Sequence, residues 1–177
     1  MTARNRLGGS ARAVPVTTRR RYPPRVPDPA AHEDAIAAIT ALVVEYATRL
    51  DAGDLDGVAR LFEKGAFRSP RGTDLVGADA VRTMYDPVML YEDGTPRTKH
   101  VLGDPIITVD EASGTATARC AFTVFQTVPG LALQPVLSGR YHDSFAMTGG
   151  AWHYVERVVL PDLWGDLSHH MGGGGGA

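Results

Sequence analysis

Apolar residues recur at spacings of three and four over residues 29–52, a pattern typical of a helix with one buried face. Asp28 is expected to cap this helix, with Pro29 at its first position, where a proline has no hydrogen bond to lose. Gly53 is expected to end it, because glycine readily takes the left-handed conformation of a helix C-cap. The apolar stripe consists of Ile36, Ile39, Val43, Tyr46 and Leu50.

Shorter patterns follow this first helix. Asp54 is placed to cap a second helix over residues 55–62, and residues 66–77 are expected to form two short extended pieces around a turn. Helical spacing returns over residues 78–90, where Pro87 bends or ends the helix. The chain is therefore predicted to begin with three helices.

From residue 97 onward the pattern has a period of two, which is typical of strands with one buried face. Four strands are predicted, over residues 97–109, 115–127, 136–145 and 152–159. Helices first and strands afterwards indicate an α+β domain with an antiparallel sheet. Such a sheet must curl over the helices to bury its apolar side, so we expect a cavity between the helices and the sheet.

The length of 177 residues suits one domain, expected over residues 28–167. Residues 1–27 are rich in arginine and proline, lack apolar periodicity and are predicted to be a disordered tail. Residues 168–177 are predicted to be a flexible Gly-rich tail. Seven of the 18 basic residues lie within the first 27 positions, which hold no acid, so the rest of the chain carries 11 basic and 20 acidic side chains and a net charge of −9.

This composition excludes several classes of function. An acidic domain argues against nucleic-acid binding, which needs clustered Lys and Arg. No apolar run reaches the roughly 18 residues of a membrane span, and residues 1–27 lack the apolar core of a secretory signal, so we expect a cytoplasmic protein. The single cysteine, Cys120, excludes an intrachain disulfide and is expected to be a core residue.

Four acidic and histidine side chains near the C-terminus superficially suggest a metal site. They fall in a terminal segment without a fixed frame, so neither a metal site nor any other cofactor is predicted. These residues are Asp162, Asp166, His169 and His170.

His100 falls on the predicted buried side of its strand, together with Leu102. It is either a core histidine bonded to the backbone or a base held in a pocket. Asp51 falls in the last turn of the first predicted helix, where the helix dipole disfavours a carboxylate, so a compensating donor such as a histidine is expected beside it. The alternative is that Asp51 is a turn residue, since Asp-Ala-Gly-Asp is good turn chemistry.

Six stretches, taken together and in order, resemble the SnoaL-like branch of the nuclear transport factor 2-like superfamily. They span residues 30–165 and read EYATRLDAGDLDGVARLF, VGADAVRTMY, TKHVLGDPIITVD, GTATARCAFTVF, SGRYHDSF and GAWHYVERVV. The resemblance implies a cone-shaped barrel of three N-terminal helices packed on a curved antiparallel sheet, and a homodimer or higher homo-oligomer through the outer face of the sheet. Function does not follow from it, because the family holds cofactor-independent dehydratases and isomerases, non-catalytic members and small subunits of ring-hydroxylating dioxygenases.

The dehydratase branch of this family places an Asp near the end of the first helix against a His at the start of a strand. Asp51 and His100 match these two positions. A Tyr five residues before the Asp matches Tyr46, and an Arg in the last strand matches Arg157. The resemblance therefore implies that His100 is a general acid and base and that Asp51 orients it.

The middle strands depart from that pattern. Thr123 stands near the position of a second acid, and His142 lies one strand later than the second histidine that scytalone dehydratase uses. The match to an elimination enzyme is therefore partial.

Arg157 is expected to share the inward side of the last strand with Val155 and Val159. If it is buried it needs an anionic partner, either a substrate carboxylate or Asp143, and the alternative is a solvated position at the rim. The other residues expected to contact a substrate are Tyr85, Tyr141 and Phe122.

Two hypotheses of function result. The preferred one is a cofactor-independent lyase of the dehydratase type, or an isomerase, acting on a small cyclic and largely apolar substrate. In it Tyr46 donates to a substrate carbonyl or departing hydroxyl, although such a tyrosine can equally be a core residue. The alternative is a non-catalytic small-molecule-binding or subunit-assembly domain, including the role of a dioxygenase small subunit beside a large partner chain.

Overall fold

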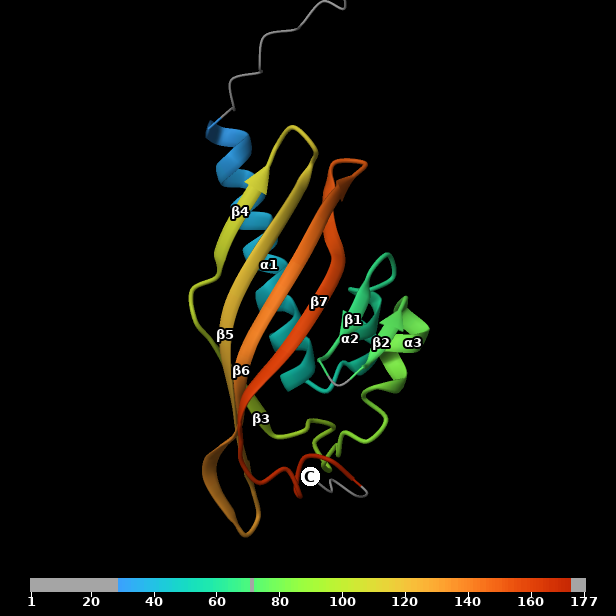
Figure 1. Ribbon diagram of the computed structural model, residues 1–177. Coiled ribbons are helices and arrows are strands. Elements are labelled where there is room, and N and C mark those ends of the chain that lie inside the picture. The colour runs from blue at the N-terminus through green and yellow to red at the C-terminus, as the bar shows by residue number, and fades with distance from the viewer. Residues whose placement is uncertain (1–28, 71, 173–177) are drawn as a thin grey trace, which may run out of the picture.

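The computed structural model of the protein describes residues 29–70 and 72–172 (Figure 1). The predicted tail of residues 1–27, the cap at Asp28 and the last five residues lie outside the described residues. The helices and short strands of the first half are α1 (Pro29–Asp51), α2 (Leu55–Arg60), β1 (Ala66–Arg68), β2 (Asp74–Val76) and α3 (Ala78–Thr83). The later strands are β3 (Thr98–Leu102), β4 (Ile106–Asp110), β5 (Thr115–Val128), β6 (Leu131–Thr148) and β7 (Ala151–Trp164).

One seven-stranded sheet has the order β2-β1-β7-β6-β5-β3, and β4 also pairs with β5. All neighbours are antiparallel except β1 and β7, which run parallel. Figure 1 shows the long strands β5, β6 and β7 twisting across the molecule with α1 lying against one face. The predicted α+β class and curved antiparallel sheet are confirmed, and the sheet does not close, because β2 remains at one edge and β3 with β4 at the other.

Strict alternation along β5 produces the inner face of this sheet. Every second side chain from Ala116 to Val128 is buried, and those between them lie on the other face. The buried set packs with the apolar stripe of α1 in one hydrophobic core. Cys120 belongs to this core with 3% of its surface exposed, as the sequence predicts. Burial of apolar surface contributes about 25 cal/mol per Å² to stability. The apolar stripe of α1 and the inner face of β5 bury such surface against each other, and this burial holds α1 against the curved sheet.

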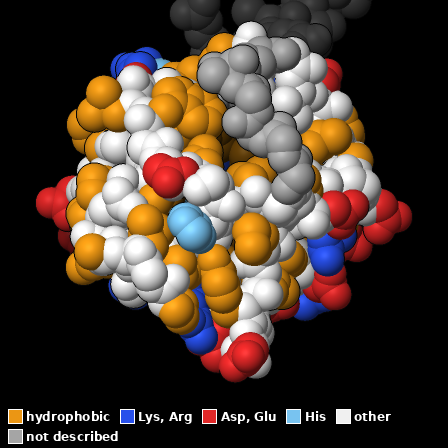
Figure 2. All heavy atoms as spheres, turned by 90° about the horizontal axis from the view of Figure 1, so that it is seen from below, with side chains coloured by type: hydrophobic (Ala, Val, Ile, Leu, Met, Phe, Trp, Pro, Cys, Tyr) orange, Lys and Arg blue, Asp and Glu red, His pale blue; other side chains and the backbone are white. Residues whose placement is uncertain are grey.

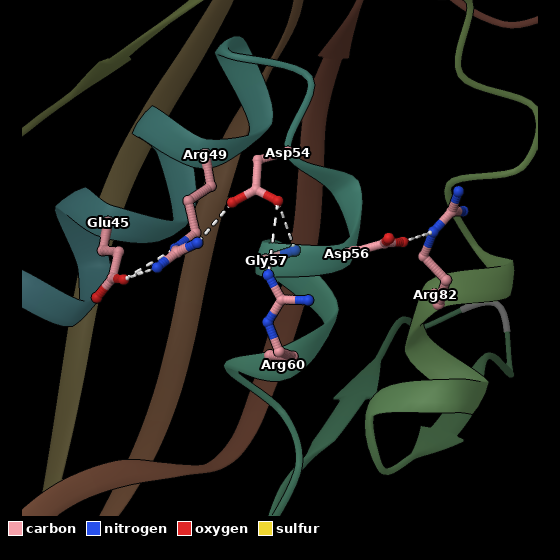
Figure 3. Close-up of polar contacts among 7 residues, drawn as sticks. All are labelled: Glu45, Arg49, Asp54, Asp56, Gly57, Arg60 and Arg82. Carbon is pink, nitrogen blue, oxygen red and sulfur yellow. Dashed lines mark hydrogen bonds and ion pairs between the residues drawn. The ribbon is translucent and has the colours of Figure 1, made fainter.

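Polar contacts hold the turn between α1 and α2 (Figure 3). Arg49 donates to Glu45 at 2.6 Å and to Asp54 at 2.5 Å. Asp54 caps α2, as predicted, by accepting a hydrogen bond from the amide of Gly57 at 2.8 Å. Each of these half-exposed ion pairs contributes little to stability, and they lie beside the turn that follows the last residue of α1, Asp51.

A bulge in β7 changes which of its residues face the core. The register between β6 and β7 shifts beside Val155, which is left as the extra residue. Arg157 is fully buried whereas Val155 is 43% exposed. The prediction that these two residues share the inward side is therefore wrong. A bulge depends on how two strands pair, so it cannot be recognised from the alternation of apolar and polar residues along one strand.

Arg157 and Asp143 form an ion pair in the middle of the core, and neither side chain is exposed. The guanidinium donates through Nε at 2.9 Å and through Nη2 at 2.7 Å to the two carboxylate oxygens. Its carbon lies 4.0 Å and 4.1 Å from the ring centroids of Tyr141 and Tyr46. Burial acts to lower the pKa of Arg157, but the charge of Asp143 and its hydrogen bonds raise that pKa well above its ordinary value, so the guanidinium keeps its charge.

The last described residues fold back onto the domain as a segment that we call the C-terminal strap (Gly165–Gly172). It is held by backbone hydrogen bonds from Gly165 to Val136 at 2.9 Å and from Met89 to His170 at 2.9 Å, and Met171 forms a β-bridge with Val88. Figure 1 shows it in red at the lower end of the molecule, close to β3. The folded part therefore extends beyond residue 167, the predicted boundary, because these contacts come from distant parts of the chain.

Gly53 ends α1 with φ +74°, and a Cβ atom there would overlap the carbonyl oxygen of Gly94. Gly53→Ala is expected to lower the free energy of unfolding, measured by urea denaturation, by more than the roughly 1 kcal/mol that a left-handed φ costs an alanine. Gly130 has φ +86° but open space around it, so Gly130→Ala should lose only the conformational part. Equal losses in the two variants would contradict the overlap with Gly94.

Asp143→Asn leaves the buried charge of Arg157 without its anion and is expected to cost about 3–5 kcal/mol of unfolding free energy in urea denaturation. Asp143→Leu combined with Arg157→Met removes both charges and should recover most of that loss. Asp162 makes the same two-bond contact with Arg140 at the surface, so Asp162→Asn is the matched control and should lose about 1 kcal/mol or less. A loss as large in the control would disprove the role of burial.

Candidate active site

Asp51, the last residue of α1, accepts three hydrogen bonds from β3. Its Oδ1 accepts from Thr98 Oγ1 at 2.9 Å, and its Oδ2 accepts from the backbone amide of His100 at 2.8 Å. The third contact joins Oδ1 to His100 Nδ1 at 2.6 Å. Three hydrogen-bond donors on one carboxylate compensate the unfavourable position of an acid at the negative end of a helix dipole. Such a compensating donor beside Asp51 is expected from the sequence.

The position of β3 in the sheet makes this contact possible. β3 pairs with β5 on one side only, so the amide of His100 is free to point away from β5 and toward the end of α1. Thr98 and His100 are two residues apart and therefore share one face of the strand, while Lys99 between them is exposed. The strand thus offers a hydroxyl, an amide and an imidazole to the same carboxylate.

The pair lies in a shielded place. The side chain of His100 is 4% exposed and that of Asp51 is 13% exposed. Burial acts to raise the pKa of Asp51, but the hydrogen bonds and charge of His100, together with the Thr98 hydroxyl, outweigh it and leave the pKa below its ordinary value. Asp51 is therefore a carboxylate at neutral pH.

An ionised carboxylate can only accept hydrogen bonds, so the proton between Asp51 and His100 belongs to Nδ1 of the histidine. In the neutral ring this leaves Nε2 as the unprotonated nitrogen. The arrangement selects one tautomer and would stabilise the imidazolium formed when Nε2 takes up a proton.

The other predicted site residues lie together, in a second group around the buried ion pair of the core. Tyr85 donates to the hydroxyl of Tyr46 at 3.1 Å, and the rings of Phe122 and Tyr141 stack with centroids 4.2 Å apart. Burial raises the pKa of Tyr46, although the charge of Arg157 opposes the shift. Among the described residues, no hydrogen bond joins this aromatic group to Asp51 or His100.

The two middle-strand positions do not add to the pair. Thr123 lies on the outer side of β5, where its hydroxyl is 2.9 Å from that of Ser138. His142 lies on the outer side of β6, opposite to that of its buried neighbours. The departure from the dehydratase pattern noted in the sequence therefore persists in the fold.

Three polar residues near the pair were not predicted. Thr98 was detectable, because it shares the parity of His100 two residues earlier. Gln126 lies opposite Thr98 in the β3–β5 register and is fully buried. His170 belongs to the C-terminal strap, and it escaped prediction because nothing local in the sequence shows that the strap is packed.

Figure 2 shows the strap end of the molecule from below, with a histidine near the centre and an acidic side chain close to it. Hydrophobic and uncharged atoms make up most of the remaining centre, and most other charged side chains lie toward the edge of the view. A surface hollow of about 350 Å³ at this end is lined by the strap, the segment before β3 and the end of β5. Its lining residues are Met89, Tyr91, Glu92, Arg97, Val128, Pro129 and His169.

The described residues contain no group of three or more acidic, histidine or cysteine side chains placed to hold a metal ion. Within the same residues, no helix has both the length and the apolar character needed to cross a membrane.

Solved structures with the same fold include proteins of different kinds. A variant of Rv3472 from Mycobacterium tuberculosis, a protein of unknown function, is 27% identical, with a TM-score of 0.63 and coverage of 76% of each chain. A protein from Novosphingobium aromaticivorans assigned as a scytalone dehydratase is 18% identical, with a TM-score of 0.63 over 84% of this chain and 98% of its own. The β subunit of a protein assigned as an aromatic-ring-hydroxylating dioxygenase, from the same organism, is also 18% identical, with a TM-score of 0.64 over 80% of this chain and 99% of its own.

These last two identities are low enough that they show the shared fold alone. No curated protein shows a significant match to the chain. The family model for the SnoaL-like domain matches residues 32–158, which is most of the α+β domain described above. The chain belongs to the SnoaL-like domain family, within the nuclear transport factor 2-like superfamily.

Proposed function

We propose that the protein is a cofactor-independent lyase of the dehydratase type, or an isomerase, acting on a small cyclic and largely apolar substrate. The observation that carries the proposal is the 2.6 Å contact between Asp51 and the shielded imidazole of His100. A histidine oriented by a carboxylate can take a proton from one atom of a bound molecule and return it to another.

The chemistry requires one group that changes protonation state twice. Nε2 of His100 removes a proton from a carbon next to a carbonyl or ring, and Asp51 stabilises the imidazolium that results. The imidazolium then gives the proton to a departing hydroxyl, which leaves as water, or to another carbon, which completes an isomerisation. General acid–base catalysis of this kind contributes about 10²–10⁴-fold to a rate.

The buried aromatic group supplies the remaining roles in this proposal. Because Tyr46 accepts from Tyr85, its own hydroxyl proton is available to a substrate carbonyl or departing hydroxyl. Phe122 and Tyr141 provide apolar walls for a ring. Arg157, whose charge Asp143 already balances, would contact the substrate through its remaining Nη1, a buried donor that has no partner among the described residues.

A second function is favoured by how the interior is filled. Arg157 packs against three tyrosine rings in the core, and the surface hollow at the strap does not include His100. In a non-catalytic binding or subunit-assembly domain, the Asp51–His100 contact would serve only to join α1 to β3. The structural likeness to a dioxygenase β subunit, in fold alone, is compatible with such a role.

We also propose that copies of the chain associate through the outer face of the sheet. Large apolar side chains are exposed along its strands, among them Val101 at 52%, Ile106 at 75% and Leu163 at 69% exposure. A surface of this kind is typical of an interface.

His100→Asn separates the two functions. The asparagine amide can replace Nδ1 as the donor to Asp51, but it has no equivalent of Nε2. We expect turnover of cyclic alcohols or enones, followed by the absorbance of the conjugated product, to fall by about 10²–10⁴-fold. The unfolding free energy should change by about 1 kcal/mol or less, because the buried hydrogen bond is kept.

His142→Asn is the matched control, since this histidine lies on the outer side of β6 and should be replaced without loss of turnover. Unchanged turnover in His100→Asn would contradict the catalytic proposal. A large loss of stability, with turnover per folded molecule preserved, would support the structural role instead.

Asp51→Asn tests the electrostatics of the pair. Because the pKa of Asp51 is lower in the folded than in the unfolded chain, its carboxylate adds stability above about pH 4 and this stability is lost as the pH falls through the lowered pKa. The difference in unfolding free energy between the wild type and Asp51→Asn should therefore shrink as the pH is lowered from about 6 to about 3. A difference that stays constant with pH would contradict the lowered pKa, and the same series on exposed Asp79→Asn gives the baseline.

A further inference from the structure

Gln126 is fully buried on the inner face of β5, and both hydrogens of its side-chain amide nitrogen are engaged in hydrogen bonds. Nε2 donates to the carbonyl of Pro96 at 3.0 Å and to that of His169 at 3.0 Å. Two carbonyl partners fix the orientation of the amide, since a flipped group would set its oxygen against both of them. The side chain therefore joins the C-terminal strap to the chain just before β3.

This orientation leaves Gln126 Oε1 as a buried acceptor with no hydrogen-bond partner among the described residues. A buried carbonyl oxygen without a donor is costly, and most such groups in folded proteins are paired. The fixed amide cannot relieve the cost by turning. Something that donates a hydrogen bond is therefore expected at this oxygen.

His170 of the strap presents a second group of the same kind. Its Nδ1 is buried and has no partner among the described residues. Burial lowers the pKa of His170, and the charge of His100 lowers it further against the opposing effect of Asp51. The ring is therefore neutral at neutral pH, and the strap that carries it is anchored on both sides of His170.

Both groups belong to the surroundings of the Asp51–His100 pair. Gln126 lies opposite Thr98 in the β3–β5 register, and the Thr98 hydroxyl donates to Asp51. The backbone carbonyl of the residue before His170 accepts a hydrogen bond from Gln126, and the charges of His100 and Asp51 both act on the pKa of His170. The Gln126–His169 hydrogen bond thus brings the two residues that carry unpartnered atoms to one junction between β5 and the strap.

We propose that Gln126 Oε1 and His170 Nδ1 form a hydroxyl-binding subsite beside His100, and that the ligand of this site is a small apolar molecule carrying a hydroxyl group. The inference rests on the proposed function and names the substrate class for it. A hydroxyl suits both atoms, because it donates one hydrogen bond and accepts others. An ether oxygen at the same place has no proton for Gln126 and leaves its acceptor unpaired.

The test compares 2-naphthol with 2-methoxynaphthalene, which has the same ring system and no donor. Binding to the full chain is measured by thermal shift and by fluorescence, and the histidine ring nitrogens are followed by NMR. We expect 2-naphthol to bind about tenfold or more tightly than the ether, since buried polar groups reject an analogue that cannot pair with them. The Nδ1 resonance of His170 should shift with the alcohol only.

Variants of the strap assign the effect. His170→Phe keeps the ring and removes both nitrogens, so the preference for the alcohol should fall by about fivefold or more, while His170→Asn offers an amide near the position of Nδ1 and should restore most of it. His169→Phe is the matched control. Only the backbone carbonyl of His169 accepts the hydrogen bond from Gln126, and the residue lines the surface hollow. Its preference should equal that of the wild type.

Equal affinities for the two probes, or a preference unchanged in His170→Phe, would overturn the proposal. Failure of 2-naphthol to bind below about 1 mM would do so too, and would mean that the two atoms hold structural water only. Loss of turnover in His100→Asn without any alcohol preference removes this inference and leaves the proposed function standing. An alcohol preference with turnover unaffected by His100→Asn supports the subsite and removes the catalytic role of His100.

Discussion

One carboxylate joins the helical and the sheet parts of this protein at the place where its chemistry is proposed. Asp51 ends α1, and three donors of β3 converge on it, two from His100 and one from Thr98. The contact compensates the unfavourable position of an acid at a helix C-terminus and holds an edge strand against the helix. The same bonds orient the imidazole, so fold and proposed function use a single interaction.

A second charged pair organises the centre of the core. Arg157 and Asp143 neutralise each other without any exposure to solvent, and tyrosine rings cover the guanidinium. A buried pair of this kind adds little net stability over a hydrophobic pair, but loss of either partner alone is costly. Its effect is to keep a polar ion pair without net charge among the aromatic side chains of the core.

The C-terminal strap completes the end of the interior that the sheet leaves open. Its backbone pairs with the segment after α3 and with Gln126 of β5, and these contacts bring His170 into the electrostatic field of Asp51 and His100. Each of these contacts spans a large distance along the chain. The environment of the proposed base therefore depends on residues from the beginning, middle and end of the domain.

The sequence by itself determined the local structure and the residue types that carry the chemistry. The stripe on α1, the stop at Gly53, the cap at Asp54 and the alternation of β5 are short-range effects of periodicity and turn chemistry, so they are legible in the sequence. The resemblance to the SnoaL-like family added the expectation that Asp51 meets His100, and the two are in contact although 49 residues separate them.

Tertiary structure alone decided the partner of Arg157, the bulge at Val155 and the packing of the strap that carries His170 against the domain. The sequence named Asp143 only as one of two candidate partners of Arg157, and it showed neither the bulge nor the strap contacts, because each depends on the register between strands or on backbone groups that any residue could supply. Local patterns state which face of an element is buried. Only the tertiary structure determines which side chain lies opposite a buried residue. This placement determines both the pairing of the charges in the core and which buried polar atoms have no partner.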